Sequence, residues 1–274
     1  MGWPGIASQS DLSPLRALMG VPSLITVSVV SHLHGRLVVS LLDDIQNHCG
    51  ELVEVLVTLN VDEPLTLDRG RYDFPIHVVL NDKGRGFAAN HNAAFRRKRG
   101  SYFCVINPDV RMRCNPFPAL LECCREREIG CVAPRVLDSS GRIEKSARSF
   151  PTPKSLARKA LGCESTRADE AIGEGCQFPD WVAGMMMLFP AAAYEAVSGF
   201  DEAYYLYYED VDICARLWGA GYKVALCPQA HVVHDARRDS HRNPRYMAWH
   251  LASMLRFFGR KWVGYSHCGR GLRR

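Results

Sequence analysis

An acidic cluster beside aromatic residues is the strongest candidate for chemistry in this sequence. Glu209, Asp210 and Asp212 directly follow a stretch, 204–208, that contains four tyrosines. Carboxylates in the first turn of a helix favour the helix dipole, but that structural explanation needs only one or two of them. A carboxylate beside stacked rings also suits a site that holds a sugar and accepts a hydroxyl proton. We therefore predict a general base in this cluster.

A second candidate, Asn107-Pro108-Asp109, follows the apolar run 102–106. Proline has no amide proton to donate, so it ends the pairing of the strand predicted there. Asp109 is then held at the end of that strand, where a carboxylate suits a divalent cation that bridges phosphates. The alternative is an aspartate that closes a turn.

Glycines precede a predicted helix at Gly84 and Gly86, and two asparagines follow at Asn90 and Asn92. Glycine lets backbone amides approach a phosphate or a ribose. The two asparagines are two positions apart, so they cannot share one face of the helix. At most one of them faces the same site as the glycines. A plain helix start is the alternative.

Two single residues are also candidates. His234 ends a predicted strand and is suited to supply one ligand to a cation held mainly by Asp109. His231, three positions earlier, faces the opposite side of that strand. Trp181 stands close to Gly184, and a ring beside a glycine that opens space suits a sugar platform. Ordinary structural roles are the alternative for both residues.

The elements that position these residues alternate between strands and helices. Strands are predicted at 24–30, 52–59, 76–80, 102–106, 131–133, 223–227 and 231–234, and helices at 37–48, 86–98, 116–127, 190–197, 209–218 and 244–261. This alternation predicts an α/β fold with a Rossmann-like, mostly parallel central sheet flanked by helices. Ligands of such sheets bind beyond the carboxyl ends of the strands, which directs attention to His32, Asn60, Asn81 and Asp109.

The 274 residues carry a formal net charge of +5, and the charge is unevenly spread. No acidic residue follows Asp239, whereas the last 35 positions are rich in arginine. This suggests an anionic surface partner, either phospholipid or nucleic acid, or else a solvated helix face. No apolar run reaches the roughly 18 residues that span a membrane, and no signal peptide is evident. We expect a cytoplasmic protein, or one bound to a membrane surface.

The cysteines number 11, and none is part of a Cys-x-x-Cys pair. Cys123 and Cys124 are adjacent on a predicted helix, and others lie in apolar runs that are predicted strands. The odd number and the scattered positions predict reduced, buried thiols rather than a disulfide framework or a zinc site.

In their order along the chain, these motifs resemble family 2 glycosyltransferases of the GT-A fold, especially the bacterial rhamnosyltransferase-like branch. The resemblance runs from about residue 26 to residue 261. The features that carry it are the strand 27–31, the helix start 86–92, Asn107-Pro108-Asp109 in place of the family's Asp-x-Asp, the acceptor-side motif from Gly199 to Arg216, and His234.

The resemblance implies an inverting enzyme that moves a sugar, with rhamnose as one candidate, from a dTDP- or UDP-sugar to an acceptor hydroxyl. The acceptor would be a glycan or a polyprenyl-diphosphate-linked sugar in cell-surface polysaccharide or lipid-linked glycan synthesis. The implied roles are catalysis by Asp210 as base with support from Glu209 and Asp212, acceptor binding by Trp181, Gly184 and Asp212, and binding of Mg²⁺ or Mn²⁺ by Asp109 and His234. Together with the rule for strand ends, we expect donor binding by His32, Asn60, Gly84, Gly86, Asn90, Asn107 and Asp109.

We also expect four regions along the chain. These are a flexible N-terminal arm (1–22), a nucleotide-sugar-binding half (23–135), an acceptor-binding and catalytic half (136–240), and a basic C-terminal helix and tail (241–274). Within the third region, 138–178 has a weak pattern that predicts a loop-rich insertion or a lid. The last region is a candidate surface for an anionic membrane, with Met247, Trp249, Met254, Phe257, Phe258 and Trp262 beside Arg256, Arg260 and Lys261. We expect no nucleic acid partner.

The sequence departs from the family pattern at two places. The second strand ends Thr58-Leu59-Asn60, without the carboxylate that the family often has there, and Asn107 replaces the first Asp of Asp-x-Asp. Two other classes stay open. A nucleotidyltransferase would show a Gly-rich basic loop after the first strand, which 31–36 matches poorly. A non-catalytic sugar- or nucleotide-binding protein would have no need of both Asp109 and Asp210.

Overall fold

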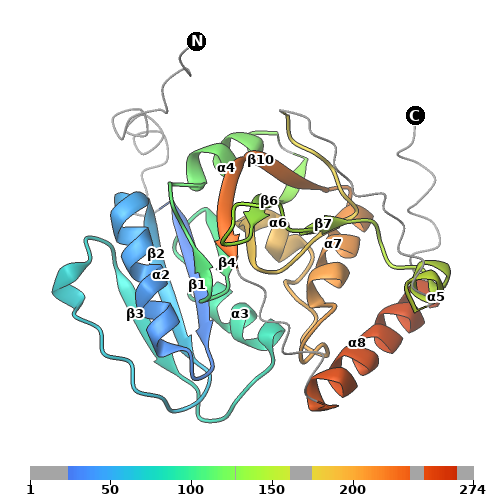
Figure 1. Cartoon of the computed structure of the whole chain (residues 1–274), viewed down its shortest axis with the longest axis horizontal. Helices are drawn as coiled ribbons and strands as arrows, with labels where there is room; N and C mark the ends of the chain where they lie inside the picture. Colours follow the sequence, from blue (N-terminus) through green and yellow to red (C-terminus); the bar gives the residue numbers. More distant parts are fainter. Residues whose placement is uncertain (1–23, 127, 161–174, 235–243, 264–274) are drawn as a thin grey trace.

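The computed structural model describes residues 24–126, 128–160, 175–234 and 244–263, so the predicted N-terminal arm and basic tail lie outside the described residues. An eight-stranded sheet has the order β3-β2-β1-β4-β9-β6-β10-β5, with helices on both faces (Figure 1). Four of its seven strand pairs are parallel, which confirms the predicted α/β class with a mostly parallel sheet.

The first half of the sheet holds β1 (Ile25–Ser31), β2 (Val53–Leu59), β3 (Ile76–Leu80) and β4 (Tyr102–Ile106), joined by α2 (Gly35–His48) and α3 (Phe87–Phe95). Alternate residues of β1 face opposite sides of the sheet. Val27 and Val29 pack in the core that includes α2, whereas Ser28 hydrogen bonds to His91 of α3 (2.8 Å). The two helices therefore cover opposite faces and leave the carboxyl ends of the strands open.

The second half begins with β5 (Val110–Arg111), α4 (Phe117–Cys123) and β6 (Ile129–Leu137). It continues with β9 (Met186–Pro190), α6 (Ala191–Ala196), α7 (Glu209–Gly219) and β10 (Lys223–His234). β9 lies antiparallel between β4 and β6, so it joins the two halves into one sheet. β6 also crosses the boundary expected at residue 135.

Three smaller elements complete the described chain. β7 (Ala147–Arg148) and β8 (Trp181–Val182) form a separate two-stranded sheet, and α5 (Pro153–Ala160) follows β7. β7 and α5 lie in the region expected to be a loop-rich insertion, of which 161–174 is outside the described residues. Two short 3₁₀ turns, Gly50–Leu52 and Arg69–Arg71, flank β2.

The C-terminal helix α8 (Pro244–Val263) packs beside α7 (Figure 1). Its Phe257 is buried with Tyr204, Tyr208 and Val211 in a small cluster apart from the main core. Within the described chain, no helix has the length and apolar character needed to cross a bilayer.

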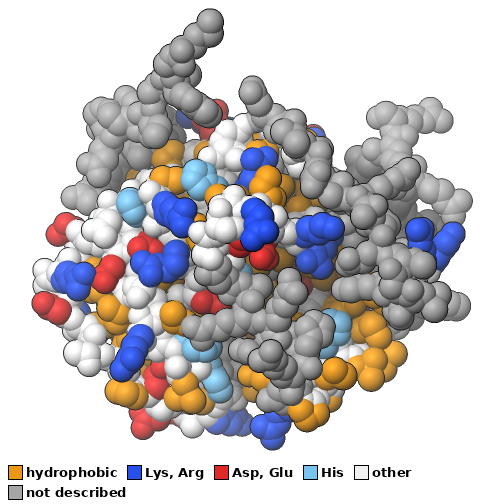
Figure 2. Space-filling model, viewed as in Figure 1, with side chains coloured by type: hydrophobic (Ala, Val, Ile, Leu, Met, Phe, Trp, Pro, Cys, Tyr) orange, Lys and Arg blue, Asp and Glu red, His pale blue; other side chains and the backbone are white. Residues whose placement is uncertain are grey.

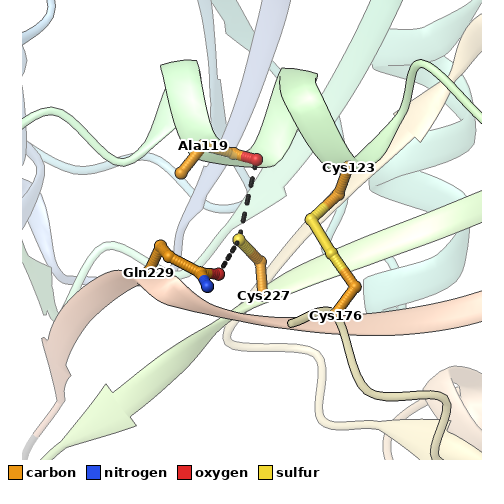
Figure 3. The surroundings of a disulfide bond; sticks show 5 residues. All are labelled: Ala119, Cys123, Cys176, Cys227 and Gln229. Carbon is orange, nitrogen blue, oxygen red and sulfur yellow. Dashed lines mark hydrogen bonds between the residues drawn. A yellow bond between two sulfur atoms is a disulfide. The ribbon is translucent and has the colours of Figure 1, made fainter. Parts of the chain in front are cut away.

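The prediction that all cysteines are reduced is wrong at one pair. Cys123 at the end of α4 forms a disulfide with Cys176, 53 residues later, and the thiol of Cys227 lies beside it (Figure 3). Only the tertiary fold brings the segment before β8 against α4, so the spacing along the chain gave no sign of this bond. The other seven described cysteines are free.

Candidate active site

Asp109 and His234 meet because two strands pair. β5 lies antiparallel to the end of β10, with Val110 opposite His234. The turn Asn107-Pro108-Asp109 closes with a hydrogen bond from Val110 N to Asn107 O (3.2 Å) and leads directly into β5. The Nε2 atom of His234 consequently lies 3.4 Å from Oδ2 of Asp109.

The electrostatics of this pair suit a cation. Burial by itself raises the pKa of Asp109, whereas the hydrogen bond with His234, and the charge of that ring when it is protonated, lower it; the net pKa lies below its usual range. The other oxygen, Oδ1, is buried and has no hydrogen-bond partner among the described residues. A carboxylate oxygen and an imidazole nitrogen are both donors that divalent ions such as Mn²⁺ accept, so the chemistry of the two residues fits a divalent metal, which Asp109 and neutral His234 would hold.

Three asparagines in the region expected to bind the donor, Asn60, Asn81 and Asn90, hold the loop 81–86 in place. Oδ1 of Asn60, at the end of β2, accepts hydrogen bonds from Asn81 (3.0 Å), Asn90 (3.0 Å) and the N–H of Arg85 (2.8 Å). Its Nδ2 donates to Arg85 O (3.0 Å) and lies 3.2 Å from His32 Nδ1. Asn60 and Asn90 therefore fix the loop 81–86 at the open edge of the sheet, while His32 is exposed there.

The two glycines of this loop differ in what surrounds them. A Cβ on Gly86 would lie 2.7 Å from Tyr205 O, closer than real side chains come, so glycine is needed there for packing. A Cβ on Gly84 would meet only ordinary contacts. Asn92 bonds to Tyr194 and Phe200, on the other side of α3 from Asn90. This confirms that the two asparagines do not share a face.

Asp210 lies in the first turn of α7 and is partly buried. Burial raises its pKa, but hydrogen bonds from the N–H groups of Val211 (2.8 Å) and Gly184 (3.1 Å) and the charge of Arg148 oppose the rise. These donors favour the carboxylate form. A Cβ on Gly184 would make only ordinary contacts, the nearest to Asp210 at 3.6 Å, so packing does not require glycine there.

Glu209 has a different environment. It is buried, and its Oε2 has no hydrogen-bond partner within the described chain. Burial and the neighbouring charge of Asp210 raise the pKa of Glu209 well above its usual value. Of the two adjacent acids, Glu209 therefore has the stronger upward shift of its pKa, because backbone N–H groups favour the carboxylate form of Asp210.

Asp212 has no exposed surface. Its carboxylate pairs with Arg216 (2.7 Å) and lies 3.5 Å from Arg260 of α8. Arg216 also donates to the carbonyls of Val197 and Gly199. This geometry suits a supporting role, in which Asp212 anchors the turn before α7, better than direct contact with an acceptor.

Two of the four tyrosines that the sequence suggested for sugar binding are buried instead. Tyr204 and Tyr208 are buried in the cluster with Phe257 of α8, and the ring of Tyr205 lies 4.6 Å from that of Trp249. Tyr207 and Tyr208 both have positive φ (70° and 66°), which costs about 1–3 kcal/mol per residue. Packing against α8 holds this strained turn, which sets the start of α7 and hence the position of Asp210.

The acceptor-side and donor-side motifs are joined through the connection between β8 and β9. Gly184 N donates to Asp210, and the next residue, Met185, accepts the N–H of Asn107 at its carbonyl (2.9 Å). Trp181 lies at the start of this connection and is partly buried, with its indole N–H bonded to Ser149 O (3.0 Å). The carboxylate of Asp210 and the turn of Asp109 are thus held by adjacent backbone groups.

Sequence reasoning missed Arg148, which lies 5.6 Å from the centre of the Trp181 ring and influences Asp210. The region 138–178 has no clear periodic pattern, so the sequence offered no signal for it.

The residues of α8 that the sequence suggested for membrane contact do not all face solvent. Phe257 is buried, and Arg256 and Arg260 form ion pairs with Asp201, whereas Met247 is exposed.

Known proteins resemble this chain in sequence and in fold. Rhamnosyltransferase WbbL of Escherichia coli is 25% identical over 249 residues, covering 87% of this chain and 94% of the relative. The N-acetylglucosaminyl-diphospho-decaprenol L-rhamnosyltransferase of Mycobacterium tuberculosis is 31% identical over 161 residues, covering 54% of this chain and 50% of the relative. No family model matches the chain.

Among solved structures, the mannosyltransferase PcManGT from Pyrobaculum calidifontis, in complex with GDP-Man and Mn²⁺, has a TM-score of 0.58. It is 17% identical and covers 86% of this chain and 64% of its own. The fold and the named relatives define the chain as a glycosyltransferase with a GT-A fold. Both of the sequence relatives described above are named rhamnosyltransferases, which supports the predicted resemblance to rhamnosyltransferase-like enzymes. A nucleotidyltransferase or a non-catalytic binding protein is set aside.

Proposed function

We propose that the protein transfers a sugar from a nucleoside-diphosphate donor to the hydroxyl of a glycan or polyprenyl-diphosphate-linked acceptor, with inversion at the anomeric carbon. The observation that carries this proposal is the backbone link between the two motifs. Gly184 bonds to Asp210, and the adjacent Met185 bonds to Asn107 of the Asp109 turn. A single displacement needs the base and the site of the leaving diphosphate to be held close together, and this short connection holds the two proposed groups on either side of it.

In this mechanism, Asp210 accepts the proton of the acceptor hydroxyl as its oxygen attacks the anomeric carbon. The N–H groups of Val211 and Gly184 hold the carboxylate in place, while burial raises the pKa of the neighbouring Glu209 well above its usual value. The diphosphate leaves on the side of Asp109 and His234. A divalent metal held by those two residues would offset the charge that develops on the departing diphosphate. The Mn²⁺ of the mannosyltransferase supports this role.

The donor is proposed to be a dTDP- or UDP-sugar, with L-rhamnose as the first sugar to test, because the two sequence relatives described above are named rhamnosyltransferases. His32 and the loop 81–86, held by Asn60 and Asn90, are proposed to contact the nucleotide. Trp181 and Gly184 are proposed to contact the acceptor sugar.

A donor screen tests this function. Thermal stability is measured with a panel of sugar nucleotides, with and without Mn²⁺ or Mg²⁺, and the stabilising donor is then assayed with a sugar-diphosphate-lipid acceptor. We expect metal-dependent stabilisation by one donor and a product of inverted anomeric configuration. Retention of configuration, or transfer that is unchanged by excess chelator, would contradict the mechanism.

We also propose that α8 rests on an anionic membrane surface. Met247, Leu251 and Leu255 are four residues apart, so they lie along one face of the helix, and each is more than half exposed. Hydrophobic side chains gather over α8 at the lower right of Figure 2. The arginine-rich sequence that follows the helix supplies positive charge for anionic headgroups.

Sedimentation with liposomes at low salt tests this contact. The double variant Leu251→Gln with Leu255→Gln should lose binding to anionic vesicles. The control Ile143→Gln, which removes an equally exposed apolar side chain from another surface, should retain it. Equal binding by all three proteins would exclude the contact.

A further inference from the structure

Arg148 occupies a fixed position next to the acceptor side of the site. β7 pairs antiparallel with β8, and Arg148 lies directly opposite Trp181 in that pairing. A further hydrogen bond, from Ala183 N to Ser146 O (2.7 Å), continues the contact toward Gly184. The backbone of Arg148 is therefore tied to the strand that carries the proposed acceptor residues.

Arg148 forms no ion pair with a carboxylate within the described chain. Its Nε and Nη2 both donate to Lys145 O (3.0 and 2.9 Å), and its guanidinium lies over the Trp181 ring. By contrast, Arg111 and Arg216 each pair with an aspartate at 2.6–2.7 Å. The side chain of Arg148 is exposed, so its remaining N–H groups are accessible to a ligand.

This cation also lies close to the proposed reaction centre. The charge of Arg148 lowers the pKa of Asp210. The carboxylate of Asp210 accepts a hydrogen bond from the N–H of Gly184, which is three residues after Trp181. A ligand that stacks on Trp181 and presents a hydroxyl to Asp210 would therefore pass Arg148. A guanidinium binds phosphate oxygens through paired N–H groups, and stacking on an aromatic ring preserves that planar fork.

We propose that Arg148 is a specificity-determining residue that binds a phosphate group of the acceptor, an inference that rests on the function proposed above. Arg148 selects acceptors that carry their sugar on a diphosphate over neutral acceptors with the same sugar. The donor diphosphate is assigned separately, to Asp109 and His234.

The test compares two acceptors with the same sugar, one linked through a diphosphate to a short polyprenol and one linked to a neutral alkyl chain. Arg148→Gln should lower kcat/KM for the diphosphate acceptor by about 10- to 100-fold, the range for a lost hydrogen bond to a charged group. It should change kcat/KM for the neutral acceptor by less than about threefold. Arg148→Lys should keep part of the preference. Arg142→Gln, which removes an exposed arginine of the same segment, should change neither value.

A loss that is equal for both acceptors would mean that Arg148 only supports Trp181, and would overturn the inference. A second measurement separates this inference from the proposed function. Farnesyl diphosphate is titrated into the protein with saturating nucleoside diphosphate on the donor side, and Arg148→Gln should weaken its binding. If binding depends on Arg148 but no sugar is transferred, the proposed function fails and the phosphate site stands. If sugar is transferred and neither readout depends on Arg148, the phosphate site alone fails.

Discussion

Replacing Asp210 with asparagine should remove most activity and leave the fold intact. The two oxygens of Asp210 accept N–H groups from Val211 (2.8 Å) and Gly184 (3.1 Å), and an asparagine offers only one oxygen. One of these N–H groups then lacks an acceptor, which costs about 1–3 kcal/mol. Burial raises the pKa of Asp210, so its charge is unfavourable in the folded protein and its removal returns part of that cost. The melting temperature should therefore change by no more than about 5 °C.

The effect on catalysis should be much larger. Loss of a general base lowers rates by about 10²- to 10⁴-fold, which is roughly 3–5 kcal/mol in the barrier. The assay measures kcat for sugar transfer together with the Kd of the nucleoside diphosphate, which should stay the same. Asp138→Asn is the matched control, because Asp138 also accepts a backbone N–H (Arg142, 2.8 Å) but lies outside the site. A kcat for Asp210→Asn above about a tenth of the wild-type value would refute the assignment of the base.

Three further predictions concern packing, metal and pH. Gly86→Ala should lower the free energy of unfolding in urea by about 1–3 kcal/mol, because its Cβ would lie 2.7 Å from Tyr205 O, whereas Gly84→Ala should cost little. Asp109→Asn should weaken Mn²⁺-dependent nucleotide binding at least about tenfold in calorimetry, with metal-free nucleotide binding unchanged; equal losses with and without Mn²⁺ would contradict a metal role. Burial raises the folded-state pKa of Glu209 above its unfolded value, so its contribution to stability should be full below about pH 4.5 and lost as the pH rises through the folded value. Urea denaturation at pH 5 and pH 8 should show this decline, and Glu209→Gln should reduce it.

The pattern of apolar residues was sufficient to predict most of the sheet and its helices. β3 and β4 begin and end at the predicted residues. The ends of short apolar runs bounded by glycine, proline or polar residues depend on the local sequence alone. Other boundaries moved. α3 ends at Phe95 rather than Lys98, and the two strands expected at 223–234 form the single strand β10 with a register shift after Cys227. Pairing with β6 decides that continuity, and no local pattern encodes it.

The tyrosine-rich segment shows why part of the site was interpreted differently from sequence. Aromatic residues beside carboxylates are compatible with a sugar site and equally with a packed surface. Contact with α8, more than 35 residues later in the chain, buries Tyr204 and Tyr208. That helix is distant along the chain, so sequence near the motif gives no sign of where the rings point.

By itself, the sequence predicted the class of protein and the residues that we propose for its chemistry, because residue type and local spacing can be read directly from the chain. Asp109, His234 and Asp210 were all named on that basis. Only the tertiary structure decided how they are related: β5 pairs with β10 to bring His234 to Asp109, and the residues Gly184 and Met185 connect Asp210 to Asn107. It also decided that Glu209 is buried beside Asp210, which raises its pKa, and that Arg148 lies opposite Trp181. Burial, pairing and electric field depend on segments that are far apart in sequence, so they exist only once the chain has folded.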